Sequence, residues 1–280
     1  MNTAALPTRT HSVPLVALVP FLIIVFGVTW GLLGLYALAP ETMNATFGEI
    51  GGDHPLFILC VYSPAIAAFS LVLYWGGLAG LKAFLSRLLL WRCPLPWALF
   101  LVVGIPLVFA AGSLVKGNLF TSPFPFESVG AMLGAMLFMV FLGPIEEFGW
   151  RGVALPLLQR HMAPIWAALL IGAVWGIWHL PAFYLSGTVQ SAWNFTPFFV
   201  GTICLSVIVT PLFNAGRGSL LLAAIFHFQV INPLWPDAQP YDTWFFLVVA
   251  ALIVWLNRDT MFTSTGAVTE VIPDEGMYRA

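Results

Sequence analysis

Eight apolar stretches, joined by short connections, dominate this sequence. They cover residues 14–39, 56–80, 96–115, 129–145, 164–185, 195–213, 219–233 and 244–257, and the last two are short. About 20 apolar residues suffice for a helix to cross the hydrocarbon core of a bilayer. Backbone exposed to lipid must satisfy its own hydrogen bonds, as a helix does. We therefore predict an all-α fold, a polytopic transmembrane bundle of about eight helices.

Composition excludes most other classes of protein. Only 8% of the 280 residues are charged and 60% are hydrophobic, whereas soluble domains are about 25% charged. No polar stretch approaches the roughly 100 residues of a soluble second domain. The net charge of -2 supplies no basic surface for nucleic acid. The three cysteines are isolated and fit neither a metal spacing nor a disulfide framework.

The chain divides into three parts by pattern. Residues 1–128 hold three predicted helices and their loops, and residues 129–257 hold the polar motifs described below. Residues 258–280 are polar, and we expect a disordered tail. The uncharged run from His11 to Pro40 is too long for a cleaved signal sequence, so we expect a retained first helix.

Basic residues are distributed unevenly between the two sides of the predicted bundle. If the spans alternate from a cytoplasmic N-terminus, nine Lys and Arg, Arg151 among them, fall on the cytoplasmic side, and Lys116 alone falls outside. Cytoplasmic loops carry an excess of Lys and Arg in membrane proteins. The sequence therefore predicts a multi-pass cell-membrane protein with both termini in the cytoplasm.

Two carboxylates and an arginine lie at the end of the fourth apolar stretch. An ionisable group at membrane depth costs about 3 kcal/mol on insertion scales, so such groups usually have a function. Glu147 and Arg151 are four residues apart and share a helix face, which predicts an ion pair. Glu146 lies about 100° around the helix, so Arg151 cannot serve both carboxylates equally. A buried, partly compensated Glu146 suits a general base. The alternative is a carboxylate pair that snorkels to the membrane edge.

Two histidines interrupt later apolar stretches. His179 follows Trp175 by one turn, and His227 lies in the seventh stretch with Asn232 beyond it. Each could form only a hydrogen bond between helices. His179 lies about 22 Å into its helix at 1.5 Å per residue. A joint site with Glu146 therefore requires the fourth helix to continue past Arg151, and we predict that it does.

The ordered set of motifs resembles one family. Glu146-Glu147-Phe148-Gly149-Trp150-Arg151, then Trp175 and His179, then His227, resembles the CPBP family. This family comprises intramembrane CAAX-type prenyl endopeptidases and bacteriocin-processing or immunity-associated proteases, including lysostaphin-resistance-like proteins. The resemblance covers residues 129–235. It implies that Glu146 activates a water with help from His179, that His227 stabilises an oxyanion, and that Arg151 holds Glu147.

The chain departs from the family pattern at two positions. Trp175 stands where the family usually has Phe. The family usually has Asn or Asp four residues after the last His, but here Ile231 is at that position and Asn232 follows it. On an ideal helix Asn232 would point about 100° away. Pro233 disfavours the helical conformation at Asn232, so an early helix end would let its side chain return to the site.

The sequence leaves cofactor and function open at several points. Glu146, His179 and His227 could form a zinc set with an open position, but a metal-free glutamate mechanism explains the same residues. The leading hypothesis is an endopeptidase that cleaves leader peptides or membrane proteins near the cytoplasmic leaflet. The alternative is a non-catalytic scaffold or bacteriocin-immunity protein of the same fold. A secondary transporter fits less well, because polar residues are concentrated in one half of the chain.

Overall fold

The computed structural model describes residues 13–121 and 126–273, and these residues form helices and loops without any strand. In chain order the α-helices are α1 (Leu18–Leu38), α2 (Pro40–Phe47), α3 (Pro55–Leu85), α4 (Leu95–Leu99), α5 (Ile105–Lys116), α6 (Val129–Leu142), α7 (Glu147–Gly149), α8 (Leu155–Gln159), α9 (Pro164–Trp178), α10 (Phe195–Ala215), α11 (Leu220–Val230), α12 (Asp242–Leu256) and α13 (Arg258–Met261). The predicted all-α class is confirmed.

Six helical segments are long and apolar enough to cross a membrane. They are Leu15–Leu38, Pro55–Leu89, Leu95–Lys116, Val129–Gln159, Pro164–Tyr184 and Phe195–Ala215. Two shorter apolar helices, α11 and α12, coincide with the last two predicted stretches. The chain is therefore a multi-pass membrane protein, and a total of eight crossings stays a prediction.

The fourth span contains the first polar motif and is broken within it. The 3-10 turn η4 (Pro144–Glu146) follows α6, and the π-helical turn η5 (Trp150–Ala154) separates α7 from α8. Proline lacks the N–H that an uninterrupted α-helix would use, which favours a change of helix type at Pro144. The span nevertheless continues to Gln159. The prediction that it passes Arg151 is confirmed.

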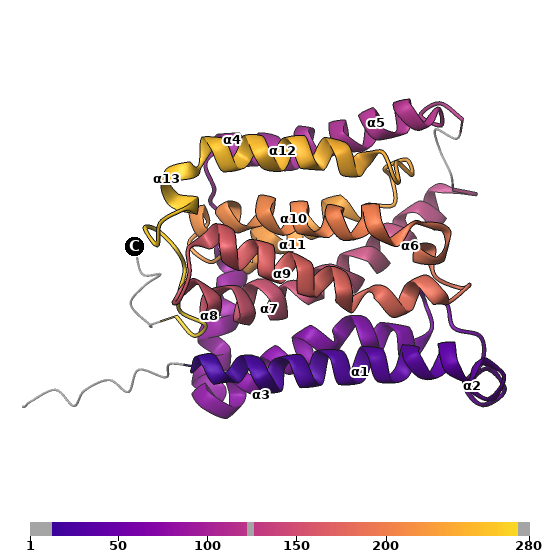
Figure 1. The fold of residues 1–280 in the computed structure, drawn as a ribbon, viewed down its shortest axis with the longest axis horizontal. Coiled ribbons are helices and arrows are strands. Elements are labelled where there is room, and N and C mark those ends of the chain that lie inside the picture. The colour runs from indigo at the N-terminus through magenta and orange to yellow at the C-terminus, as the bar shows by residue number, and fades with distance from the viewer. Residues whose placement is uncertain (1–12, 122–125, 274–280) are drawn as a thin grey trace, which may run out of the picture.

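The long helices lie side by side, and successive spans run in opposite directions (Figure 1). Helices α1 and α3 form one layer, α9, α10 and α11 lie in the middle, and α5 and α12 form the opposite layer. Small residues bring α9 and α10 together, because a side chain at Gly172 or Gly176 would collide with α10. At Gly130 and Gly134 no other helix is that close.

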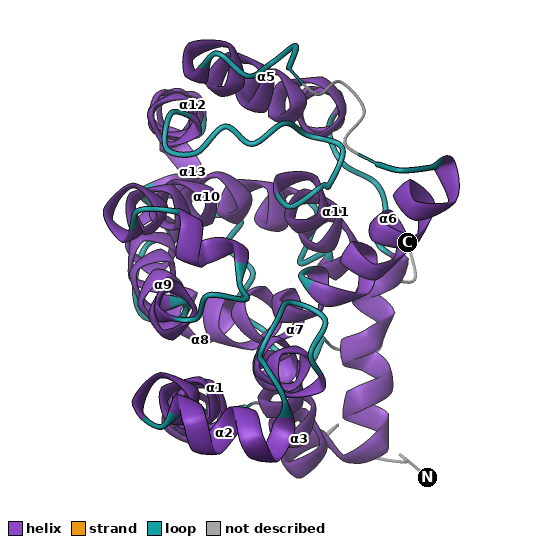
Figure 2. Cartoon of the chain, turned by 90° about the vertical axis from the view of Figure 1, so that its right-hand side faces the viewer, coloured by secondary structure: helices purple, strands orange, loops and turns teal. Residues whose placement is uncertain are grey.

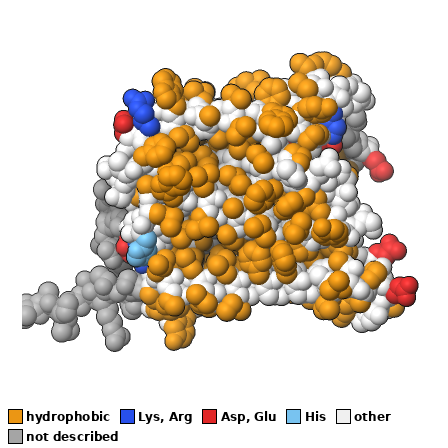
Figure 3. All heavy atoms as spheres, in the orientation of Figure 1, with side chains coloured by type: hydrophobic (Ala, Val, Ile, Leu, Met, Phe, Trp, Pro, Cys, Tyr) orange, Lys and Arg blue, Asp and Glu red, His pale blue; other side chains and the backbone are white. Residues whose placement is uncertain are grey.

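The two ends of the bundle carry opposite charge. We call one end the basic end; it holds the start of α1 and also α13, and its Lys and Arg are Lys82, Arg87, Arg92, Arg160, Arg217 and Arg258. The other, the acidic end, holds α2 and the end of α5, and carries Glu41, Glu49, Asp53, Glu127, Asp237 and Asp242 with Lys116. On the face in Figure 3 the charged side chains lie at the two ends, with a hydrophobic band between them. Arg151, expected on the cytoplasmic side, is instead buried within the bundle at 1% exposure.

Much of the C-terminal segment packs against the basic end, so the expectation of a disordered tail is wrong for residues 258–273. Val271 is fully buried. Asn214 accepts a hydrogen bond from the backbone N–H of Val268 at 3.0 Å. Arg160 donates to the Thr269 carbonyl at 2.7 Å and pairs with Glu270 at 3.0 Å. The remainder of the predicted tail, 274–280, lies outside the described residues.

Candidate active site

Glu146 ends the η4 turn and faces α9. Its carboxylate is only 4% exposed, and Oε2 accepts a hydrogen bond from the indole Nε1–H of Trp175 at 2.8 Å. No described residue donates a hydrogen bond to its second oxygen, Oε1. In the described chain, Oε1 is also not one of the polar atoms that are both completely buried and without a hydrogen-bond partner. Glu146 therefore keeps one accessible oxygen inside a buried environment.

Glu147 has a different environment from its neighbour. Oε1 of Glu147 lies 3.1 Å from a guanidinium nitrogen of Arg151 and 2.7 Å from Nδ1 of His227. All three side chains are at most 4% exposed, so the predicted ion pair between Glu147 and Arg151 is confirmed. The Arg151 guanidinium also lies 4.9 Å from the centre of the Trp175 ring, within the range of a cation–π contact. Glu147 thus links the first motif to α11.

The two histidines are each fixed through one ring nitrogen. Nδ1 of His179 lies 2.8 Å from the carbonyl of Trp175, one turn earlier in the chain. A carbonyl only accepts, so Nδ1 carries the proton and Nε2 keeps a lone pair in the neutral ring. His227 uses Nδ1 for Glu147, and its Nε2 lies close to Gly143, where an added Cβ would be 3.0 Å away. Both Nε2 atoms are left for a substrate or water.

Asn232 lies beyond the end of α11, which stops at Val230. The early helix end that the sequence suggested is therefore present. Its Oδ1 accepts from the backbone N–H of Leu234 at 3.0 Å, and its Nδ2 donates to Gln229 at 3.1 Å. Asn232 borders the cavity described next, but its amide is occupied by these local partners.

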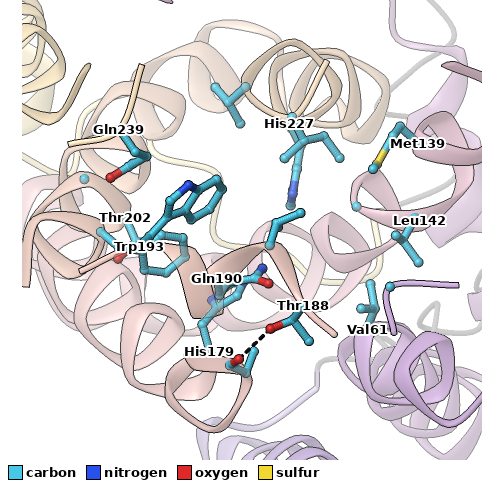
Figure 4. A pocket seen from close by; sticks show the side chains of 18 of the residues that line it. Val61, Met139, Leu142, His179, Thr188, Gln190, Trp193, Thr202, His227 and Gln239 are labelled. Atoms are coloured by element: carbon cyan, nitrogen blue, oxygen red, sulfur yellow. Dashed lines mark hydrogen bonds between the residues drawn. The ribbon is translucent and has the colours of Figure 1, made fainter. Parts of the chain in front are cut away.

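A cavity of about 540 Å³ brings the predicted residues together. Glu146, His179, His227 and Asn232 all line it, with Trp175 between them. The Trp175 ring lies 5.6 Å from the His179 ring and 5.5 Å from the His227 ring, centre to centre. Figure 4 shows His179 and His227 on different walls of this cavity. Residues from two of the long spans and from α11 therefore converge on one pocket. Glu147 and Arg151 do not line the cavity; they lie behind His227.

The sequence analysis missed two features of this site. Trp175 was noted for its place beside His179, but not as the donor to Glu146; the indole N–H of a buried tryptophan usually has a partner, and that was the available signal. The polar residues Gln190, Gln239 and Asp242 also line the cavity. They lie in or beside loops, and no local pattern connects them to the motifs.

The proposed zinc set does not form in this arrangement. Among the described residues, no group of three or more His, Cys, Asp or Glu side chains is placed to hold a metal ion. The residues present therefore do not fit a three-ligand metal site as they stand.

Comparison with known proteins supports the interpretation of the motifs. Residues 127–231 match the family model described as Type II CAAX prenyl endopeptidase Rce1-like. The chain is also 26% identical over 177 residues to the CAAX prenyl protease 2 of Methanococcus maripaludis. That alignment covers 59% of this chain and 65% of the relative, so the chain spans just under two thirds of the relative's length. Both matches support the CPBP family that the motifs indicated, over residues 127–231.

Proposed function

We propose that this protein is an intramembrane endopeptidase in which Glu146 is the general base. The observation that carries the proposal is the contrast between the two adjacent carboxylates. Glu147 is held by Arg151 and His227, whereas Glu146 has one oxygen available in the cavity. A general base must reach the proton that it removes. Glu146 meets this requirement and Glu147 does not.

In the proposed reaction, Oε1 of Glu146 takes a proton from a water molecule as the water oxygen adds to the scissile carbonyl. The unprotonated Nε2 of His179 accepts a hydrogen bond from the same water and orients it. The carbonyl π bond breaks and its oxygen becomes an oxyanion. When the C–N bond then breaks, Glu146 returns the proton to the leaving amine, so the reaction consumes one water and leaves the enzyme unchanged.

His227 stabilises the oxyanion in this proposal. Its Nδ1–H is held by Glu147 at 2.7 Å, so its Nε2 can donate only when the ring carries a second proton. The carboxylate of Glu147 stabilises that imidazolium, much as a buried acid supports a histidine in serine proteases. Arg151 acts one step further away by holding Glu147. A single oxyanion donor is commonly worth about 3–4 kcal/mol.

We propose a peptide or membrane-protein substrate and an orientation with the basic end in the cytoplasm. The cavity wall is mostly apolar and includes Leu33, Phe138 and Phe246, which suits a hydrophobic peptide segment. The Lys and Arg at the basic end support its cytoplasmic location. Both ends of the described chain lie there (Figure 1).

The test is cleavage of a panel of peptides by purified protein in liposomes. The panel contains leader peptides, transmembrane segments and a prenylated CAAX peptide. Glu146→Gln keeps an oxygen for the Trp175 N–H but cannot take a proton, so we expect a loss of at least about 100-fold with an unchanged melting temperature. Equal cleavage by both proteins, or no cleavage by either, would support the non-catalytic scaffold instead.

A further inference from the structure

The cavity is open toward one end of the bundle. Its loop residues come from three connections: α2 to α3 contributes Gly52, α9 to α10 contributes the 187–193 segment, and α11 to α12 contributes the 232–239 segment. All three connections lie at the acidic end, which faces the viewer in Figure 2. Gly187, Val189 and Asp237 line the cavity and are exposed. The mouth is therefore at the acidic end.

The basic end contributes nothing to the cavity. No lining residue comes from the described connections 86–94, 160–163 or 216–219, or from residues 257–273. The C-terminal segment covers this end and is held by Arg160, Asn214 and Arg87, which donates to the Glu270 carbonyl. Access to Glu146 from the basic end is thus blocked by packed protein.

The charges of the two ends favour one orientation in a membrane. Lys116 is the single basic residue of the described acidic end, and it is paired with Asp237 at 2.7 Å. The six Lys and Arg of the basic end lie on short connections or at helix ends, where basic residues determine orientation. The distribution of Lys and Arg therefore favours an orientation in which the end that carries the mouth faces away from the cytoplasm.

We propose that the cavity takes its substrate from the extracytoplasmic side of the membrane, so that the substrate is an exported segment of a polypeptide. This deepens the proposed function and rests on it. It also revises the expectation of cleavage near the cytoplasmic leaflet, which is incompatible with the predicted orientation once the mouth is located. A cytoplasmic chain end, such as a prenylated C-terminus, would have no direct route to Glu146.

The polar groups near the mouth are consistent with a peptide occupant. The side-chain carbonyl oxygens of Gln190 and Gln239 are buried and have no hydrogen-bond partner in the described part of the chain. The carboxylate of Asp242 is buried beside Gln239, which donates to it at 3.2 Å. A buried acceptor without a partner is unfavourable, and an extended peptide supplies one backbone N–H per residue. Both glutamines line the cavity, so a change of side-chain rotamer would turn these buried acceptors toward the backbone of a polypeptide drawn in from the mouth.

Thiol labelling in oriented membranes tests the location of the mouth. Cys60, Cys93 and Cys204 are first replaced by alanine, and one cysteine is then introduced at either end. Val189→Cys reports on the mouth, because Val189 lines the cavity and is 64% exposed. Leu89→Cys is the matched control at the basic end, where Leu89 is 78% exposed. The probe is a membrane-impermeant maleimide added to right-side-out or inside-out vesicles.

We expect at least tenfold stronger labelling of Val189→Cys than of Leu89→Cys in right-side-out vesicles, and the reverse in inside-out vesicles. Any other pattern overturns the proposal, provided that detergent exposes both thiols. If the cysteine-free protein does not fold, fluorescent-protein and alkaline-phosphatase fusions to the native C-terminus replace it. Fluorescence without phosphatase activity supports the proposal, and phosphatase activity overturns it.

Labelling does not depend on catalysis, so the two proposals can fail separately. If the protein labels as expected but cleaves nothing, the proposed orientation stands and the proposed protease function is wrong. If the protein cleaves peptides but labels from the cytoplasmic side, the protease function stands and the proposed extracytoplasmic substrate is wrong. Repeating the labelling in Glu146→Gln separates the two results further.

Discussion

The hydrogen bond from Trp175 to Glu146 gives the sharpest test of how the site is positioned. Replacing Trp175 by phenylalanine keeps an aromatic ring between the two histidines but removes the N–H that lies 2.8 Å from Oε2. A hydrogen bond to a charged group contributes about 1.5–3 kcal/mol, and about 1.4 kcal/mol corresponds to a tenfold change in rate. We therefore expect kcat to fall by about 10- to 150-fold.

Trp150→Phe is the matched control for this variant. Trp150 is 1% exposed, does not line the cavity, and its N–H has no hydrogen-bond partner in the described chain. Both substitutions remove the same atoms from the protein interior, but only Trp175→Phe removes a contact with Glu146. Steady-state cleavage in liposomes and thermal melting are measured for both proteins.

The reasoning makes a specific claim about the kinetic parameters. Because the indole N–H positions Glu146 and does not bind substrate in the proposal, KM should change less than about twofold while kcat falls. If the kcat of Trp175→Phe lies within twofold of that of Trp150→Phe, the hydrogen bond does not position the base. If KM carries the loss instead, Trp175 acts in substrate binding.

Three other perturbations follow from contacts described above. Gly143→Ala places a methyl group against Ile231 and 3.0 Å from Nε2 of His227, so cleavage should fall by at least tenfold; unchanged cleavage would show that His227 is not needed there. Glu147→Leu leaves the buried Arg151 without its carboxylate, which typically costs 3–5 kcal/mol; the melting temperature should drop sharply, and the second substitution Arg151→Met should recover part of it. Because the described residues form no metal-binding group, a chelator such as 1,10-phenanthroline should leave the cleavage rate unchanged, and a loss that zinc restores would contradict this.

The positions of the helices could be predicted from hydropathy alone, because a membrane span leaves a strong local signal. The predicted stretch 195–213 corresponds to the observed helix Phe195–Ala215, and the predicted stretch 164–185 corresponds to the observed segment Pro164–Tyr184. The pair Glu147 and Arg151 was equally accessible, since four-residue spacing fixes a shared face. The continuation of the fourth span beyond Arg151 followed from a geometric requirement, that Glu146 should reach His179.

What could not be predicted depends on contacts between distant parts of the chain. The segment around Val268 is polar and looked disordered, but Asn214 and Gln159 supply the hydrogen bonds that its backbone needs. Local composition does not reveal such partners. The end of the bundle at which the cavity opens was also hidden, because it depends on which loops surround Glu146 in three dimensions.

The packed C-terminal segment has a consequence for the membrane itself. A water-containing hollow within a bilayer endangers the ion gradient only when it has an exit on each face. Here the cavity has its mouth at the acidic end, and none of its lining residues comes from the segment around Val271, which packs at the opposite end. In the proposed reaction the cleavage products would leave through the same mouth, and the cavity would give ions no continuous path from one side of the membrane to the other.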